Sequence, residues 1–224
     1  LLGVAPEADI VHFKVFPDSG GSALIGDIEQ ALEAALALDA EPEIEIAAVN
    51  LSLGFGNATG ETGTRLSDEV LALLEAGIVP VAAAGNSGTV YPEGVSVIAA
   101  SPGAVGVSAT DAGGAFAAFS QRDPELTDIA APGTDILYQT LSGQTGRVDG
   151  TSFSAPYVSG SVARLQEAAD ETLGAPLSPE AVLELLQLSG APVAAAEPAE
   201  GYRIADAEAA LELFLDDPYA WADT

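Results

Sequence analysis

Residues 149–160 read DGTSFSAPYVSG and contain a serine whose surroundings favour nucleophilic chemistry. Ser152 follows a glycine and a threonine, at the start of a segment with the pattern of a helix. The N-terminus of a helix stabilises the negative charge that develops during acyl transfer, so a serine there could attack a carbonyl. A serine at this position can also simply cap the helix by accepting a backbone hydrogen bond. The segment alone leaves both roles open.

Two further polar stretches follow runs with the pattern of strands. The run IVPVAAAG (78–85) is almost wholly apolar, which is typical of a strand covered on both faces. Asn86 comes directly after it, and its amide could donate a hydrogen bond to an oxyanion, although asparagine beside glycine is also an ordinary turn residue. The stretch NLSLG (50–54) could present a strand edge to an extended peptide, or could be a buried strand end.

These stretches, in this order, resemble the subtilisin-like serine peptidases, the subtilases of peptidase family S8. The resemblance extends over essentially the whole chain, and the pairing of DGTSFSAP with an upstream AAAGNSG is its most specific part. The matching pieces are GVAPEADIVHFKVF (3–16), VNLSLG (49–54), VPVAAAGNSG (79–88), DIAAPGTDI (128–136) and DGTSFSAPYVSG (149–160).

The resemblance implies a serine endopeptidase that hydrolyses a polypeptide substrate through an acyl-enzyme. Ser152 would be the nucleophile, and Asn86 and the Ser152 N–H would stabilise the oxyanion. Ser154 is a rival nucleophile, but two residues further into the helix its side chain should point elsewhere. The implied substrate cleft is lined on one side by Ser52, Leu53 and Gly54, and on the facing side by Ala83, Ala84 and Gly85.

The small residues of the facing wall also suggest what the cleft accepts. Ala83 and Gly85 should leave room for a medium or large apolar side chain in the first specificity pocket.

The base that a serine nucleophile needs is not evident in the sequence. In the family, an Asp motif and a His-Gly-Thr-His motif precede the segment GVAP, which here begins at Gly3. We therefore expect residues 1–224 to be a partial peptidase domain with little activity, whose Asp and His come from a missing N-terminal segment. His12, the only histidine, falls in a run with the pattern of a strand and is expected to be a partly buried structural residue. Asp9, three positions away, would point to the opposite strand face.

Two other classes of function stay open. A naturally shortened pseudopeptidase could bind extended peptides at the Ser52–Gly54 edge without cleaving them. A nucleotide-binding domain could use AAAGNSG as a phosphate loop, but neither G-x-x-x-x-G-K-[ST] nor a full G-x-G-x-x-G is present.

Composition narrows the partners and cofactors. The 224 residues include 34 Asp and Glu against 6 Lys and Arg, a formal net charge of −28, which argues against nucleic acid and anionic membrane surfaces. Cysteine is absent, which excludes disulfides and thiolate zinc sites, and no run is long and apolar enough to span a membrane.

No metal or cofactor is expected in these residues. The resemblance places the family's firmest calcium site mostly upstream of Gly3, so calcium is possible in the complete domain but cannot be placed in these residues. The family implies an extracellular or cell-surface location, in a bacterium.

Runs with strand and helix patterns alternate along the chain and predict a three-layer α/β/α domain with a mostly parallel sheet, its N-terminal part missing. Working residues of such sheets lie beyond the carboxyl ends of the strands, which should bring 50–56 and 82–88 together. Strands are expected over 9–16, 44–54, 78–85, 94–100, 104–110 and 129–141, the last with a turn at Pro132-Gly133. Helices are expected over 22–38, 65–77, 151–170, 178–190 and 205–215, with Ser22 and Ser178 as N-caps, Gly77 and Gly190 as stops, and a mobile loop over 191–200.

Overall fold

A mostly parallel sheet forms the centre of the computed structural model, which describes residues 3–194 and 201–222. Within these residues, six strands have the order β1-β2-β3-β4-β8-β7. Neighbouring strands are parallel from β1 to β8, and β7 is antiparallel to β8. The strands are β1 (Ala48–Leu51), β2 (Val79–Ala83), β3 (Val105–Thr110), β4 (Ile129–Pro132), β7 (Ala191–Pro192) and β8 (Arg203–Ile204).

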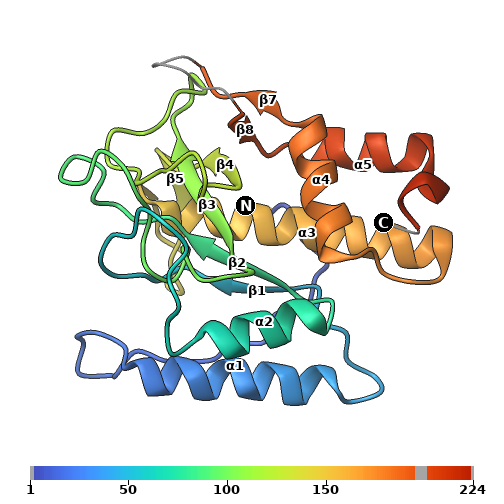
Figure 1. Ribbon diagram of the computed structural model, residues 1–224, viewed down its shortest axis with the longest axis horizontal. Coiled ribbons are helices and arrows are strands. Elements are labelled where there is room, and N and C mark those ends of the chain that lie inside the picture. The colour runs from blue at the N-terminus through green and yellow to red at the C-terminus, as the bar shows by residue number, and fades with distance from the viewer. Residues whose placement is uncertain (1–2, 195–200, 223–224) are drawn as a thin grey trace.

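Helices cover both faces of this sheet, so the predicted three-layer α/β/α architecture is confirmed (Figure 1). One face packs against α1 (Ile25–Asp39) and α2 (Ser67–Glu75), and the other against α3 (Thr151–Leu173), α4 (Pro179–Ser189) and α5 (Ala207–Asp216). The position of β2 between the two helical layers explains why its sequence does not alternate between apolar and polar residues. Val81 belongs to the core under α3, whereas the next residue, Ala82, belongs to the core under α2. A strand buried on both faces needs apolar residues at every position.

Several predicted boundaries agree with the structure for the expected physical reasons. The Ser178 side chain accepts a hydrogen bond from the Ala181 N–H and caps α4, with a proline in the first turn. Gly77 follows α2 with φ of +85°, a conformation that only glycine adopts without strain. Ser22, in contrast, lies outside α1, which begins at Ile25 without a side-chain cap. The predicted loop 191–200 begins with the short strand β7, and residues 195–200 lie outside the described part of the chain.

Two predicted strands do not form. Residues 9–16 pair with no other strand in the described part of the chain, and Ile10 is 88% exposed. An extended run becomes a strand only through the hydrogen bonds of a neighbouring strand. Residues 94–100 form a buried turn in which the Ser96 N–H donates to the Ala84 carbonyl. Their apolar character reflects complete burial of Val95 and Ile98, not membership of the sheet.

A β-hairpin, β5 (Ile136–Gln139) with β6 (Thr145–Val148), was not anticipated as a pair and leads directly into α3. A short 3-10 helix, η1 (Pro218–Trp221), follows α5. Across residues 3–194 and 201–222, no helix has the length and apolar character needed to cross a membrane.

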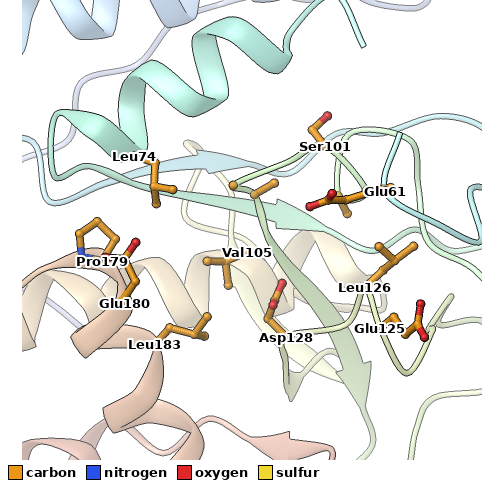
Figure 2. Close-up of a pocket in the computed structure, with 14 residues that line it drawn as sticks. Glu61, Leu74, Ser101, Val105, Glu125, Leu126, Asp128, Pro179, Glu180 and Leu183 are labelled. Atoms are coloured by element: carbon orange, nitrogen blue, oxygen red, sulfur yellow. The ribbon is translucent and has the colours of Figure 1, made fainter. Parts of the chain in front are cut away.

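A pocket of about 400 Å³ opens at the end of the sheet where β3 and β4 begin (Figure 2). Carboxyl groups from loops and from α4 line it, those of Glu61, Glu125, Asp128 and Glu180. Asp128 is the most informative of them. Burial raises the pKa of its carboxyl to about 6, even though Asp128 Oδ2 accepts a hydrogen bond from the Gly106 N–H that lowers it.

This raised pKa predicts a pH-dependent loss of stability. The folded chain holds the Asp128 proton more tightly than the unfolded chain, where the pKa is near its ordinary value of 3.8. The stabilisation is therefore full below pH 3.8 and is lost as the pH rises through about 6. Asp128→Asn should remove up to about 2–3 kcal/mol of this decline, as measured by urea unfolding at pH 4 and pH 7. An unfolding free energy that falls equally in both proteins would contradict the prediction.

Candidate active site

Ser152 is the second residue of α3 and lies partly buried at the edge where β1 and β2 end. The turn before it depends on Gly150, which has φ of +154° and whose N–H donates to the Gly133 carbonyl (2.8 Å). A Cβ at Gly150 would lie 3.4 Å from the side-chain nitrogen of Asn86. The distance is an ordinary van der Waals contact, so glycine is required here by the backbone conformation and not by the proximity of Asn86.

Asn86 follows β2, and its side chain has a defined orientation. Its Oδ1 accepts hydrogen bonds from the Thr151 N–H (2.9 Å) and from Thr151 Oγ1 (3.0 Å). Because both of these groups are donors here, the oxygen of the amide must face α3 and the NH₂ group must face away from Thr151. In the described residues, no acceptor lies within hydrogen-bonding distance of Asn86 Nδ2. The residue is exposed, so its N–H groups can meet a ligand beside the start of α3.

Thr151 is the functional residue that sequence reasoning missed. Its side chain is 1% exposed, and Oγ1 accepts from the Gly85 N–H (3.1 Å) while donating to Asn86. Thr151 thus joins the loop after β2 to the first turn of α3. Its place between Gly150 and Ser152 in DGTS was a signal, since a threonine hydroxyl at a helix start commonly bonds nearby backbone.

The edge predicted to bind substrate is connected directly to Ser152. Ser52 Oγ donates to the Ser152 carbonyl (2.7 Å), and Ser152 Oγ donates to the Ser52 carbonyl (3.3 Å). Asn50 Nδ2 in turn donates to Ser52 Oγ (2.9 Å). The structure therefore brings Ser52 and Ser152 together across 100 residues of sequence. Leu53 is partly buried and Gly54 exposed, so this edge reaches the surface.

The facing wall is less accessible than the sequence suggested. Ala83 and Ala84 are buried, with 3% and 0% exposure. Their carbonyls accept hydrogen bonds from Ser96 Oγ (2.9 Å) and from the Ser96 N–H (2.6 Å). The Gly85 carbonyl accepts from the Gln121 N–H (2.9 Å). These carbonyls already bond within the protein, so a bound peptide would contact this wall by packing.

The other two candidate residues, Ser154 and His12, do not lie with Ser152 and Asn86. Ser154 is fully buried, and its Oγ donates to the Pro132 carbonyl (3.2 Å), so it is withdrawn from the surface where Ser152 lies. His12 is exposed in the unpaired segment 9–16, which corrects the expectation of a partly buried histidine in a strand. The reason is the same as for the segment: without a neighbouring strand, its side chains are left in solvent.

No group of three or more His, Asp or Glu that could hold a metal ion occurs among residues 3–194 and 201–222. No step of the chemistry below involves a metal ion.

A hydroxyl at a helix N-terminus, beside an outward-facing amide NH₂ at the carboxyl edge of a doubly covered parallel sheet, is the arrangement of a serine acyl-transfer site. The subtilase family matches residues 1–202, and the chain belongs to this family. Subtilisin E of Bacillus subtilis (strain 168) is 35% identical over 165 residues, and the thermostable alkaline protease of Halalkalibacterium halodurans is 33% identical over 162 residues. These matches cover 73% and 71% of this chain, respectively, and 40% of each relative.

Solved structures show the same similarity. The patellamide maturation protease PatA superposes with a TM-score of 0.79 and 28% identity, over 96% of this chain and 77% of that one. The prenylagaramide maturation protease PagA gives a TM-score of 0.72 and 26% identity, over 88% of this chain and 70% of that one. The chain spans about 40% of the length of the first curated relatives and about three quarters of the structural ones.

Proposed function

We propose that residues 1–224 are part of a serine endopeptidase that hydrolyses peptide bonds through an acyl-enzyme on Ser152. One observation carries the proposal: Thr151, the residue before Ser152, holds the oxygen of the Asn86 amide, which leaves the NH₂ group free to donate to a ligand at the start of α3. Attack of Ser152 Oγ on a peptide carbonyl forms the C–O bond and moves the carbonyl electron pair onto oxygen. The Asn86 NH₂ and the Ser152 N–H would donate hydrogen bonds to that oxyanion, aided by the N-terminus of α3.

The proton of Ser152 requires a base, and the proposal assigns the base to an Asp and a His from a preceding segment. His12 does not fill this role, because it is exposed in a segment that makes no strand pairing in the described residues. Strand β1 is at the edge of the described sheet, and residues 9–16 are unpaired within it, so both could pair with further chain. Such chain would arrive next to Ser52 and hence next to Ser152.

The test compares two forms of the protein on a chromogenic peptide. The 224-residue chain should turn over substrate no faster than its Ser152→Ala variant. The chain extended by the residues encoded upstream of the Leu1 codon should show turnover that disappears in Ser152→Ala. Robust, Ser152-dependent turnover by the shorter chain would contradict the assigned source of the base. An upstream sequence without Asp and His motifs would contradict the peptidase proposal itself.

A second candidate is a pseudopeptidase that binds extended peptides without cleaving them. One observation favours it: Ser152 Oγ donates its hydrogen bond to the Ser52 carbonyl. In an active peptidase the nucleophile would instead donate this bond to its base. This candidate predicts peptide binding that survives Ser152→Ala together with an absence of turnover in the extended chain. For either candidate we propose a bacterial extracellular or cell-surface location, with any calcium bound by the complete domain. One similar relative, 30% identical over 188 residues, is instead the major intracellular serine protease of Bacillus subtilis (strain 168).

A further inference from the structure

We propose that Gln121 and Ser96 close the cleft between the two glycine-containing walls and restrict the substrate residue before the scissile bond to glycine, alanine or serine. The inference rests on the proposed function, since it defines the substrate of that same site. It also departs from the expectation that small wall residues leave room for a large apolar side chain.

Ser96 fills the space beside the first wall. A Cβ at Gly54 would lie 2.7 Å from Ser96 Oγ and 2.8 Å from Ser96 Cβ. A Cβ at Gly85, on the facing wall, would lie 3.5 Å from the same Ser96 Cβ. Ser96 therefore lies between the two walls, and the absence of side chains at Gly54 and Gly85 makes room for Ser96 instead of for substrate.

Gln121 extends across the same space. A Cβ at Gly85 would overlap Gln121 Oε1 and lie 2.8 Å from Gln121 Cδ, so the side chain rests directly on Gly85. At its other end, Gln121 Nε2 donates to Asn57 Oδ1 (2.8 Å) and to the Gly56 carbonyl (3.4 Å). One side chain thus connects the loop after β2 with the loop after β1. It forms a floor between them.

This floor should not move aside when a substrate binds. Gln121 is 2% exposed and Ser96 1% exposed. Gln121 Oε1 accepts from the Ser87 N–H (3.3 Å), and its NH₂ makes the two bonds to Asn57 and Gly56, so displacement would leave the buried Gln121 amide without its partners. Ser96 Oγ is held by its bond to the Ala83 carbonyl.

The chemistry of the floor points to a small side chain and not to a charged one. Gln121 is neutral, and both N–H groups of its amide are already donated within the protein. No lysine, arginine or carboxylate takes part in this group of bonds, so nothing in it would recognise a charged substrate residue. A methyl or hydroxymethyl group adds little volume above Gln121 and Ser96, whereas an aromatic ring would have to displace them.

The test measures binding by the full 224-residue chain, so it needs no turnover. Fluorescein-labelled tetrapeptide amides Ala-Ala-Ala-Xaa, with alanine or phenylalanine as the last residue, are titrated by fluorescence anisotropy. The alanine peptide should bind about 10-fold or more tightly than the phenylalanine peptide. Gln121→Ala should reduce or reverse that ratio. Gln121→Met, which keeps the volume and removes the amide, should retain it. Circular dichroism establishes whether each variant is folded. If Gln121→Ala does not fold, Ser96→Gly replaces it in the test, because that substitution vacates the space beside Gly54.

The possible outcomes distinguish a failure of the size restriction from a failure of the proposed peptidase function. Tighter binding of the phenylalanine peptide by the unaltered chain would overturn the size restriction while leaving the peptide cleft intact. A ratio unchanged in both Gln121→Ala and Ser96→Gly would equally overturn it. Failure of every peptide to bind would overturn the premise that residues 1–224 hold a peptide cleft between these walls, whereas the proposed function is decided separately by turnover in the upstream-extended chain.

Discussion

Replacing Asn86 with alanine should lower kcat by about 10²- to 10³-fold in the upstream-extended chain, with little change in KM; this magnitude is carried over from the oxyanion asparagine of a subtilisin, a member of the same family. The reason is geometric. Thr151 holds the Asn86 amide at its Oδ1 end, so its Nδ2 is oriented in advance to donate to the oxygen, and that hydrogen bond strengthens as negative charge develops there. A group that acts only in the transition state affects kcat and not substrate binding. Steady-state kinetics on a chromogenic peptide measures both constants.

The matched control for this prediction is Asn86→Asp. Aspartate keeps an oxygen that can accept from the Thr151 N–H and hydroxyl, so the start of α3 should be preserved. It has no NH₂ donor, and its negative charge opposes the oxyanion, so the loss of kcat should be at least as large as for alanine. If Asn86→Asp were as active as the unaltered protein, Asn86 would be a structural turn residue and not part of the site.

Replacing Gly133 with alanine should destabilise the fold by about 3 kcal/mol or more, near the upper end of the cost of overpacking a core. A Cβ at this position would overlap Ser154 Oγ, lie 2.6 Å from Ala109 Cβ on β3 and lie 3.1 Å from the Gly150 carbonyl. The Ser154 hydroxyl can rotate away, but the strand and the backbone before Ser152 cannot move cheaply. Urea or thermal unfolding of the 224-residue chain measures the effect without any assay of activity.

Gly60→Ala is the control for Gly133→Ala. No atom lies within 4 Å of a Cβ at Gly60, and its φ is outside the left-handed region, so stability should change by no more than about 0.5 kcal/mol. Equal effects of the two substitutions would show that the contacts at Gly133 do not limit stability. The Gly133 carbonyl accepts from the Gly150 N–H, so Gly133→Ala should also disturb the turn that presents Ser152.

Much of the fold could be predicted because it depends on local pattern. The apolar run 78–85 becomes the fully buried strand β2, and the serine–proline start at 178–179 becomes the capped start of α4. Alternating strand and helix patterns required parallel strands with helices on both faces, which the structure has. The same local reasoning failed for 94–100, since an apolar run reports burial, and a buried turn is as apolar as a buried strand.

The sequence by itself determined which residue types meet at the candidate site. Ser152 at a helix start and Asn86 after a buried strand were both expected from their neighbours, and both occur where expected. Only the tertiary structure decided how they are oriented and what surrounds them. The direction of the Asn86 amide depends on Thr151, 65 residues away, and the floor between Gly54 and Gly85 depends on Ser96 and Gln121. Local patterns report helix, strand and burial, whereas these contacts arise from which loops the sheet order brings together.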